Sequence, residues 1–553
     1  ASNWNLAWRM NRFIDLHQHL GPTPEHLTRA VKLMDRVGLG VVVNLSGGTV
    51  VRAGDAPSVF ERTKALADGL FPGRIVHYMN LDFSGWDDPG FSGHAAAQIE
   101  EGFRLGAAGL KLFKYVGLNQ RDKSGALLKI SDPRLDAAWR KCGELGMPVS
   151  IHVADPRAFW LPYDSSNERW AELRDHPNWW FGDPAKYPKR EELLGELNRV
   201  IARHPGTTFV CVHFANNAED LDWVEARLDE FPNMHADLAA RIPEIGRQAP
   251  DKVRRLFMKH QDRIYFATDL QVKDQLVLGS SDSGPAPTDD GAVEFFEKHW
   301  RWLETNDRDF AHMTPIQGDW TISGIGLPPA VLRKIYFDNA RKLLARSMPA
   351  PSLAIPVLDR GAQPDGRLDE GVWSQAAVAR LEYDFATFRA RPDMATEVRV
   401  FATEQDLFFG FTCPYTTLSM FPDPDLSKER IGLWENDVVE IFIGTRAGDY
   451  KEFEVSPGGE MLDLVVTLPD RDFPWTSGFE ARVLRSAGTW VAEIRIPRAA
   501  VGGNALKPGA PLLLNLYRHD RANQAKLAWS PTLSKTFHTP ARFGTAWIQS
   551  PDP

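Results

Sequence analysis

The chain has 553 residues, of which 43% are hydrophobic and 25% charged, and its formal net charge is −9. This composition is typical of a globular protein with two or three domains. The acidic balance argues against a nucleic-acid-binding protein, which needs a basic surface. No apolar run approaches the roughly 20 residues of a membrane span. The three cysteines are far apart and odd in number, so we expect no disulfide framework.

The first predicted strand, FIDLHQH at residues 13–19, carries two histidines one residue apart. Side chains alternate between the two faces of a strand, so Asp15, His17 and His19 share a face. Taken alone, this stretch favours a metal-binding pair and a hydrogen-bonded core pair equally.

Short apolar runs then alternate with amphipathic helical patterns as far as about residue 344. The predicted strands are FIDLHQH, LGVVVNLS, RIVHYMNLDF, AGLKLFKYV, PVSIHVAD, TTFVCVHFAN, NMHADLA and RIYFATDL. Eight such strands with helices between them predict an α/β fold, a distorted (β/α)8 TIM barrel over residues 1–346.

Polar residues interrupt these apolar runs near their C-terminal ends, where barrels of this kind place their chemistry. They are His17, His19, Lys111, His152, His213, Asp237 and Asp269. Burying so many unpaired polar groups would be costly. Convergence on one divalent cation would satisfy them together.

Imidazole and carboxylate groups bind zinc-type ions at about 2 Å, and an open coordination position lowers the pKa of bound water to about 7. His17, His19, His152 and Asp269 would form a mononuclear site. Asp269 would also orient and deprotonate the water. We therefore predict one or two divalent ions, with zinc first and manganese as the alternative.

Two further residues have more than one predicted role. His213 is either another ligand or a group that polarises a substrate carbonyl. Lys111 would bridge two ions if its amine were carboxylated; unmodified, it would contact a substrate anion or act as a local counter-charge. We count both among the catalytic candidates, together with Asp269.

FIDLHQH, GLKLFK, VSIHVAD, FVCVHF and FATDL, in this order, resemble the amidohydrolase superfamily of metal-dependent hydrolases. The closing helix KIYFDNARKLL is similar to the one that ends many members. The resemblance covers about residues 10–346 and implies a mono- or dinuclear metal site. It implies hydrolysis of ester, lactone or amide bonds, although some members are decarboxylases. It also implies metal-ligand roles for the residues that match the motif: His17, His19, His152 and Asp269.

Two predicted connections are unusually long, from Asp155 to about Lys189 and from Leu270 to about Leu327. Long insertions at a catalytic face are often lids or binding walls. The first is rich in aromatic residues, which form either a substrate wall or a satellite core. The predicted substrate-binding residues are Trp160, Trp180, Tyr115, Arg241 and Asp237. Asp237 and Arg241 have a structural ion pair as the slightly favoured alternative.

A proline-rich linker is predicted at residues 347–356, and short alternating strands over residues 357–553 predict an antiparallel β-sandwich. The segments DGRLDEGVW, LWENDVVEIFIG, YKEFEVSPGGEMLD, GTWVAEIRIP, LAWSP and HTPARFG resemble carbohydrate-binding module family nine. This resemblance implies a sugar held between aromatic faces, with Trp434 and Trp529 at the aromatic positions. The alternative is a sandwich that has lost sugar binding and serves as a structural partner.

The combination of domains predicts a metal-dependent hydrolase acting on a carbohydrate-derived lactone, ester, amide or glycosidic linkage, by analogy. The first alternative is a decarboxylase or lyase acting on an aromatic or sugar acid. The second is a glycan-binding surface protein with an inactive barrel. We expect a small-molecule or oligosaccharide substrate, no nucleic acid, and a periplasmic or secreted location of bacterial type, with the cytoplasm as the alternative. The sequence begins ASNWNL, without Met or a signal-peptide pattern, as in a processed chain.

Overall fold

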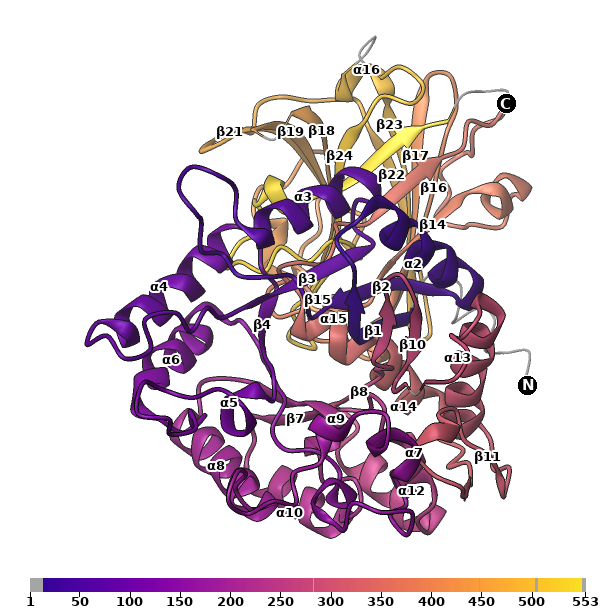
Figure 1. Ribbon diagram of the computed structural model, residues 1–553. Coiled ribbons are helices and arrows are strands. Elements are labelled where there is room, and N and C mark those ends of the chain that lie inside the picture. Colours follow the sequence, from indigo (N-terminus) through magenta and orange to yellow (C-terminus); the bar gives the residue numbers. More distant parts are fainter. Residues whose placement is uncertain (1–12, 282, 447, 503–505, 550–553) are drawn as a thin grey trace. The chain divides into compact units, whose positions relative to one another are not determined.

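The computed structural model describes residues 13–281, 283–446, 448–502 and 506–549 (Figure 1). The chain divides into two compact units, Ala1–Met348 and Pro349–Pro553. No helix in the described part of the chain is both long enough and apolar enough to cross a membrane.

The first unit is built on parallel strands that pair in chain order. They are β1 (Phe13–Leu20), β2 (Leu39–Asn44), β3 (Ile75–Asn80), β4 (Gly109–Leu112), β5 (Val149–Ile151), β6 (Phe209–Cys211), β7 (Met234–Asp237) and β8 (Ile264–Tyr265). After β8 the chain continues into β9 (Leu270–Val272), which pairs in parallel with β1. The Leu16 N–H also donates to the Phe266 carbonyl at 3.1 Å, so the sheet closes on itself. The predicted distorted TIM barrel is confirmed.

The distortion lies in the eighth strand, which was predicted as one run. It breaks between β8 and β9, where Asp269 adopts a left-handed backbone conformation with φ 61°. Such a conformation is uncommon for a residue other than glycine. The break places Asp269 beside the end of β1. The backbone N–H of Asp269 donates to the His17 carbonyl at 2.9 Å.

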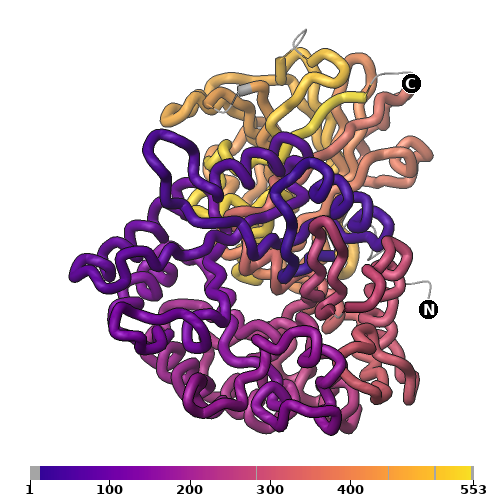
Figure 2. Tube along the Cα trace, viewed as in Figure 1, coloured from indigo at the N-terminus to yellow at the C-terminus, as the bar shows by residue number. Residues whose placement is uncertain are grey.

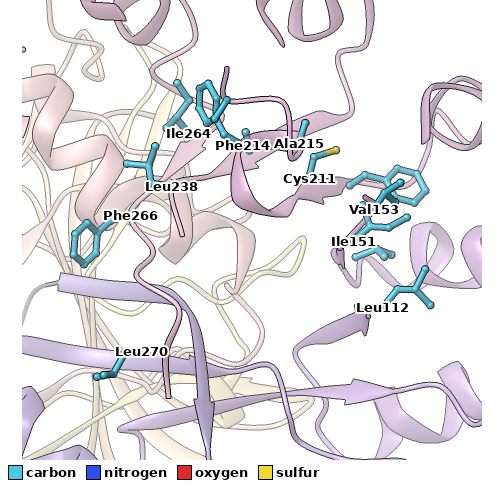
Figure 3. Close-up of a cluster of buried hydrophobic side chains, with 14 of the residues drawn as sticks. Leu112, Ile151, Val153, Cys211, Phe214, Ala215, Leu238, Ile264, Phe266 and Leu270 are labelled. Carbon is cyan, nitrogen blue, oxygen red and sulfur yellow. The ribbon is translucent and has the colours of Figure 1, made fainter. Parts of the chain in front are cut away.

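Helices follow most strands, and the longer ones lie outside the sheet (Figure 1, Figure 2). They are α2 (Pro24–Val37), α3 (Val59–Leu70), α4 (Phe91–Arg104), α5 (Tyr115–Leu118), α6 (Asp136–Leu145), α8 (Arg190–Arg203), α9 (Val212–Ala215), α10 (Leu221–Glu230), α11 (Ile242–Gly246), α12 (Pro250–Lys259), α14 (Pro329–Arg333) and α15 (Asn339–Leu343). Local sequence sets their ends: the Ser58 hydroxyl accepts the Glu61 N–H, and the Glu61 carboxylate accepts the Ser58 N–H. Leu112, Ile151 and Cys211, from three neighbouring strands, belong to one large buried cluster (Figure 3).

The two long insertions are folded and contact each other. The first holds α7 (Trp170–Leu173), and the second holds β10 (Leu276–Leu278), α13 (Asp289–Glu304), β11 (Phe310–Ala311) and β12 (Thr321–Ile322). His176 Nε2 lies 3.0 Å from the Ser281 carbonyl, and the Ser283 N–H donates to Asp175 at 2.9 Å. Together the insertions form one side of the barrel mouth.

The second unit consists of two β-sheets, and the predicted antiparallel sandwich is confirmed. One sheet runs β13 (Ser352–Ile355), β26 (Gly544–Ile548), β24 (Leu512–Asp520), β18 (Val438–Arg446), β19 (Asp449–Val455), β20 (Met461–Thr467) and β21 (Asp470–Asp472), with β15 (Tyr383–Asp384) and β25 (Ala525–Ala528) alongside. The other runs β14 (Ala377–Leu381), β16 (Thr396–Ala402), β17 (Asp406–Pro414), β23 (Thr489–Pro497) and β22 (Glu480–Ser486).

Strand β13 lies inside the segment predicted as a linker. It pairs in parallel with β26, and its side chains Leu353 and Ile355 are buried on one face. The alternating apolar residues of SLAI therefore add a strand to the sheet. The flanking prolines had pointed to a linker, but prolines at the ends of an edge strand remove no hydrogen bond from the ladder.

Candidate active site

Three side chains at the mouth of the barrel place their ligand atoms around one point. His17 Nε2 lies 3.3 Å from His19 Nε2, and both lie 3.4 Å from Asp269 Oδ1. Atoms that bind a tetrahedral zinc ion at about 2.0–2.2 Å lie roughly 3.3–3.6 Å from one another. Asp269 Oδ1 is buried and accepts no hydrogen bond from the described residues. The donor set and its spacing therefore fit a divalent ion.

The Nδ1 atom of each of the two imidazoles has a polar partner. His17 Nδ1 lies 2.9 Å from Asp237 Oδ2, and His19 Nδ1 lies 2.6 Å from Ser46 Oγ. Such contacts fix the ring orientation and leave each Nε2 facing the common point. Ser46 was not among the residues predicted from the sequence.

The structure corrects the predicted role of Asp237 in substrate binding. Its carboxylate is fully buried, and it accepts the His213 N–H at 2.7 Å as well as contacting His17. It makes no ion pair with Arg241, which pairs with Asp155 at 3.8 Å. Asp237 points beneath the histidines, so it positions them and cannot reach a substrate.

His213 and His152 lie beside the three converging residues. The His213 ring centroid is 4.9 Å from that of His17 and 4.5 Å from that of His152. His213 Nδ1 lies 2.8 Å from the Ala239 carbonyl. His213, His17 and Asp237 form a second group with ligand atoms within 4.8 Å of one another.

His152, which the sequence placed among the metal ligands, belongs to no such group within the described residues. Its Nε2 lies 3.3 Å from Asp155 Oδ1, and its side chain lines the same cavity as Asp269. Asp155 also accepts from Lys114 Nζ at 2.5 Å. The sequence analysis did not single out Asp155, although its place three residues after His152 in IHVAD was a usable signal.

Burial and neighbouring charges set the protonation of the site. Burial lowers the pKa of His17 and of His19, and it lowers the pKa of His152 to about 4. Burial also raises the pKa of Asp269, but the imidazoles of His17 and His19 more than offset it, and the pKa stays below its ordinary value. Neutral imidazoles beside an ionised carboxylate are the forms that bind a divalent ion.

The converging residues open into a cavity of about 460 Å³. Its aromatic lining is Phe113, Tyr115, Phe159 and Trp179. Arg241 and Lys111 also line it. Tyr115 and Arg241, two of the predicted substrate-binding residues, are thus among the residues that line this cavity. Phe113 was missed, although its position two residues after Lys111 puts both on one face of the chain.

The structure corrects the predicted roles of Trp160 and Trp180, which do not line this cavity. The Trp160 Nε1–H donates to the Pro188 carbonyl at 3.0 Å, and the Trp180 Nε1–H donates to the Leu161 carbonyl at 2.7 Å. Both rings pack within the insertion, where Trp160 contacts Phe181. The alternative of a satellite core applies to these two residues, and the neighbouring Trp179 faces the cavity.

The sandwich has a cavity of its own, of about 250 Å³. Trp434 lines it and is 40% exposed, as a ring that stacks on a ligand would be. Trp529 is only 7% exposed and does not line the cavity; it packs against Gly544, where a Cβ atom would meet its ring. The predicted sugar contact of Trp529 is therefore wrong, because its place on the buried face makes it a core residue.

The carboxyl groups of Glu440 and Glu452 line this second cavity, and Glu454 lies beside them. Glu440 on β18 lies opposite Glu454 on β19, and Glu452 is on the same face of β19. All three are buried. Burial raises the pKa of Glu454, and the neighbouring Glu440 and Glu452 raise it further. Burial also raises the pKa of Glu452, to about 7.

Comparisons with known proteins agree with this two-part architecture. Residues 76–346 match the family model described as Amidohydrolase, and residues 365–550 match the model described as Carbohydrate family 9 binding domain-like. No curated protein matches the chain.

Solved structures resemble each part separately. The 2,6-dihydroxybenzoate decarboxylase from Rhizobium is 16% identical, with 61% of this chain and 99% of that chain covered, at a TM-score of 0.33. The 5-carboxyvanillate decarboxylase from Sphingomonas paucimobilis is 13% identical, with 61% and 99% covered, at a TM-score of 0.33. A family 9 carbohydrate-binding module from Caldicellulosiruptor kristjanssonii, in complex with cellotriose, is 12% identical, with 36% and 94% covered, at a TM-score of 0.27. The first unit therefore contains an amidohydrolase-family domain over residues 76–346, and the second unit contains a family 9 carbohydrate-binding-like domain over residues 365–550.

Proposed function

We propose that the barrel is a metal-dependent hydrolase that cleaves a lactone, ester, amide or glycosidic linkage in a carbohydrate-derived substrate. The observation that carries this proposal is the convergence of His17 Nε2, His19 Nε2 and Asp269 Oδ1, at 3.3–3.4 Å from one another, at the mouth of a cavity. A divalent ion held there, zinc first and manganese as the alternative, would supply Lewis acidity and lower the pKa of water.

The residues around this point have separate tasks in the proposal. Asp269 takes the proton of the attacking water and passes it to the leaving group, because its carboxylate is ionised and lies beside the converging imidazoles. Asp237 holds His17 in place through the 2.9 Å contact to Nδ1. His213 and His152 face the same cavity and are candidates to complete the ligand set or to polarise the substrate carbonyl.

The carbohydrate part of the proposal rests on the second unit and on the lining of the first. Trp434 offers an exposed ring at the mouth of the sandwich cavity, which suits stacking on a sugar. Tyr115 and Trp179 offer flat surfaces in the barrel cavity. We infer from the sugar-binding type of the sandwich that the protein works in the periplasm or outside the cell.

A decarboxylase or lyase acting on an aromatic or sugar acid is the second candidate. The cationic side chains of the barrel cavity favour it, because Lys111 and Arg241 would both attract an acid. The two reactions are separated by product analysis in oxygen-18 water. Hydrolysis puts the label into a product at the broken bond, whereas decarboxylation does not.

The central test is the variant Asp269→Asn, assayed on a panel of sugar lactones and esters that the wild-type protein hydrolyses. We expect kcat to fall by about 10³-fold, because the proton acceptor is lost. The matched control is Asp274→Asn, whose carboxylate is 99% exposed and lies outside the cavity. Near-normal kcat in Asp269→Asn would refute its assigned role.

Elemental analysis of the purified protein tests the ion itself. About one ion per chain supports a mononuclear site at His17, His19 and Asp269. About two ions per chain would point to a bridging role for a carboxylated Lys111. Absence of any divalent ion, even after the protein is incubated with zinc or manganese, would contradict the proposal.

A further inference from the structure

The ammonium group of Lys111 is the least satisfied charge in the barrel cavity. The side chain is 1% exposed, and Nζ has no hydrogen-bond partner within the described residues. Nζ lies 5.6 Å from the centroid of the Phe113 ring. A buried charge without a partner is costly, so a stable fold needs something to compensate it.

The carboxylates that line the cavity are already committed to other groups. Asp155 accepts from Lys114 at 2.5 Å, and Glu172 accepts from Arg169 at 2.7 Å. Asp269 faces the two histidines of β1. Asp269 and the buried Asp237 stabilise the charge of Lys111 from a distance, but no carboxylate of the described residues accepts a hydrogen bond from its Nζ.

The cavity as a whole carries a surplus of positive charge. Five Lys or Arg side chains and three carboxylates line it, a formal excess of two. A divalent ion beside Asp269 would enlarge this excess, so it would increase the need for an anion at Lys111. Low local polarity strengthens such interactions, because they are screened less than in water.

Arg241 adds a second donor that is free to bind. Its side chain is 6% exposed and lines the cavity, and Nε has no hydrogen-bond partner in the described chain. The Nη atoms donate to the Asn216 side chain and to the Ala240 carbonyl, which hold the guanidinium in place. A fixed guanidinium with a free N–H suits a carboxylate oxygen.

We propose that the barrel cavity selects substrates that carry a carboxylate, which Lys111 binds with support from Arg241. Resting on the function proposed above, this makes the substrate class a sugar acid, of the uronate or aldonate type, and not a neutral sugar. The carboxylate supplies the hydrogen-bond acceptor that Lys111 Nζ lacks within the described residues, while the bond to be cleaved lies toward Asp269.

The test measures binding and needs no turnover. The full chain is loaded with zinc and used in a Trp434→Ala background, which weakens sugar binding at the sandwich. The contribution of the barrel is the difference between this protein and the same protein carrying Lys111→Met. Calorimetric titration compares D-glucuronate and D-galacturonate with their neutral parents, D-glucose and D-galactose. We expect at least one uronate to bind about tenfold or more tightly than its parent sugar, because hydrogen bonds to charged groups are the stronger ones.

Variants assign this preference to Lys111. Lys111→Met should reduce the ratio of uronate to neutral-sugar affinity to about one, whereas Lys111→Arg should restore most of it. The matched control is Lys32→Met, an exposed lysine outside the cavity, which should keep the full ratio. Metal content and melting temperature, measured for each variant, report whether the fold and the ion site are intact.

Several results would overturn the proposal. One is a wild-type protein that binds no uronate more tightly than the neutral parent, and another is a preference that survives Lys111→Met. A carbamate signal in carbon-13 spectra after labelling with bicarbonate, lost in Lys111→Met, would make Lys111 an anion and overturn it too. Benzoate is titrated alongside these sugars, and if it were the only acid whose binding depended on Lys111, the sugar-acid assignment would be overturned. Because no turnover is measured, failure here is independent of the Asp269→Asn result.

Discussion

The two units each place charged side chains in a cavity, but with opposite arrangements. In the barrel, the Asp269 carboxylate faces the imidazoles of His17 and His19, which offset the cost of its burial and keep its pKa low. In the sandwich, Glu440 lies opposite Glu454 on the neighbouring strand, and Glu440 and Glu452 add to the effect of burial in raising the pKa of Glu454. The barrel site is therefore suited to hold a charged ion. In the sandwich, burial and neighbouring carboxylates raise the pKa of Glu440 and of Glu454, which favours the protonated form of these acids.

Of the changes that test this comparison, the largest effect is expected on zinc affinity when Asp237, the partner of His17, is replaced. Asp237→Asn keeps the shape of the side chain but weakens its hold on His17 Nδ1, 2.9 Å away. We expect the affinity for zinc to fall about 10- to 100-fold, which is the usual effect of losing such a partner. Competition with a metal chelator measures it, and Asp55→Asn, at an exposed position, is the control.

An unchanged zinc affinity in Asp237→Asn, with only a lower melting temperature, would limit Asp237 to a structural role. The carboxylate that contacts His17 Nδ1 would then not contribute to metal binding, and it would no longer mark a difference between the barrel and the sandwich.

A smaller effect, dependent on pH, is expected in the sandwich. The folded pKa of Glu454 lies above its ordinary value, so the folded state binds a proton that the unfolded chain has released. Stability from this group is therefore lost as pH rises from the ordinary carboxyl pKa through the folded pKa. Glu454→Gln cannot ionise, so its stability relative to wild type should improve from pH 5 to pH 8, by about 1 kcal/mol.

Differential scanning calorimetry of the full chain measures this change, and Glu404→Gln, at an exposed position, is the control. An advantage for Glu454→Gln that is the same at both pH values would mean that ionisation of the cluster does not limit stability. The sandwich would then differ from the barrel only in how its carboxylates are placed, and not in the effect of their ionisation on stability.

The convergence at the barrel mouth could be predicted because it follows from topology. Parallel strands end at one rim, so polar residues at the ends of the first and eighth strands meet there. The alternation of side chains then puts His17 and His19 on one face. The sequence pattern contained no information on depth: nothing in HADLAAR distinguishes a side chain on the rim from one beneath it, and Asp237 lies beneath.

Aromatic residues were harder to place, because irregular segments have no periodicity. In the adjacent pair Trp179 and Trp180, only the first lines the barrel cavity, and the choice depends on the turn that ends at Trp179. Trp529 follows strand β25 directly. The family resemblance suggested a ligand contact there, but the ring packs against Gly544 and is buried. Tertiary packing decided both cases.

The smallest effect is expected at Trp434, which separates stacking from packing in the sandwich. Trp434→Ala removes a 40% exposed ring from the cavity mouth, so we expect affinity for cello-oligosaccharides to fall about three- to fivefold, with little change in melting temperature. Trp529→Ala is the informative contrast, because it removes a buried ring and should lower the melting temperature. If Trp434→Ala left sugar affinity unchanged, or if no tested sugar bound the wild-type sandwich, the domain would be a structural partner of the barrel. Its buried acids would then serve the fold and not a ligand.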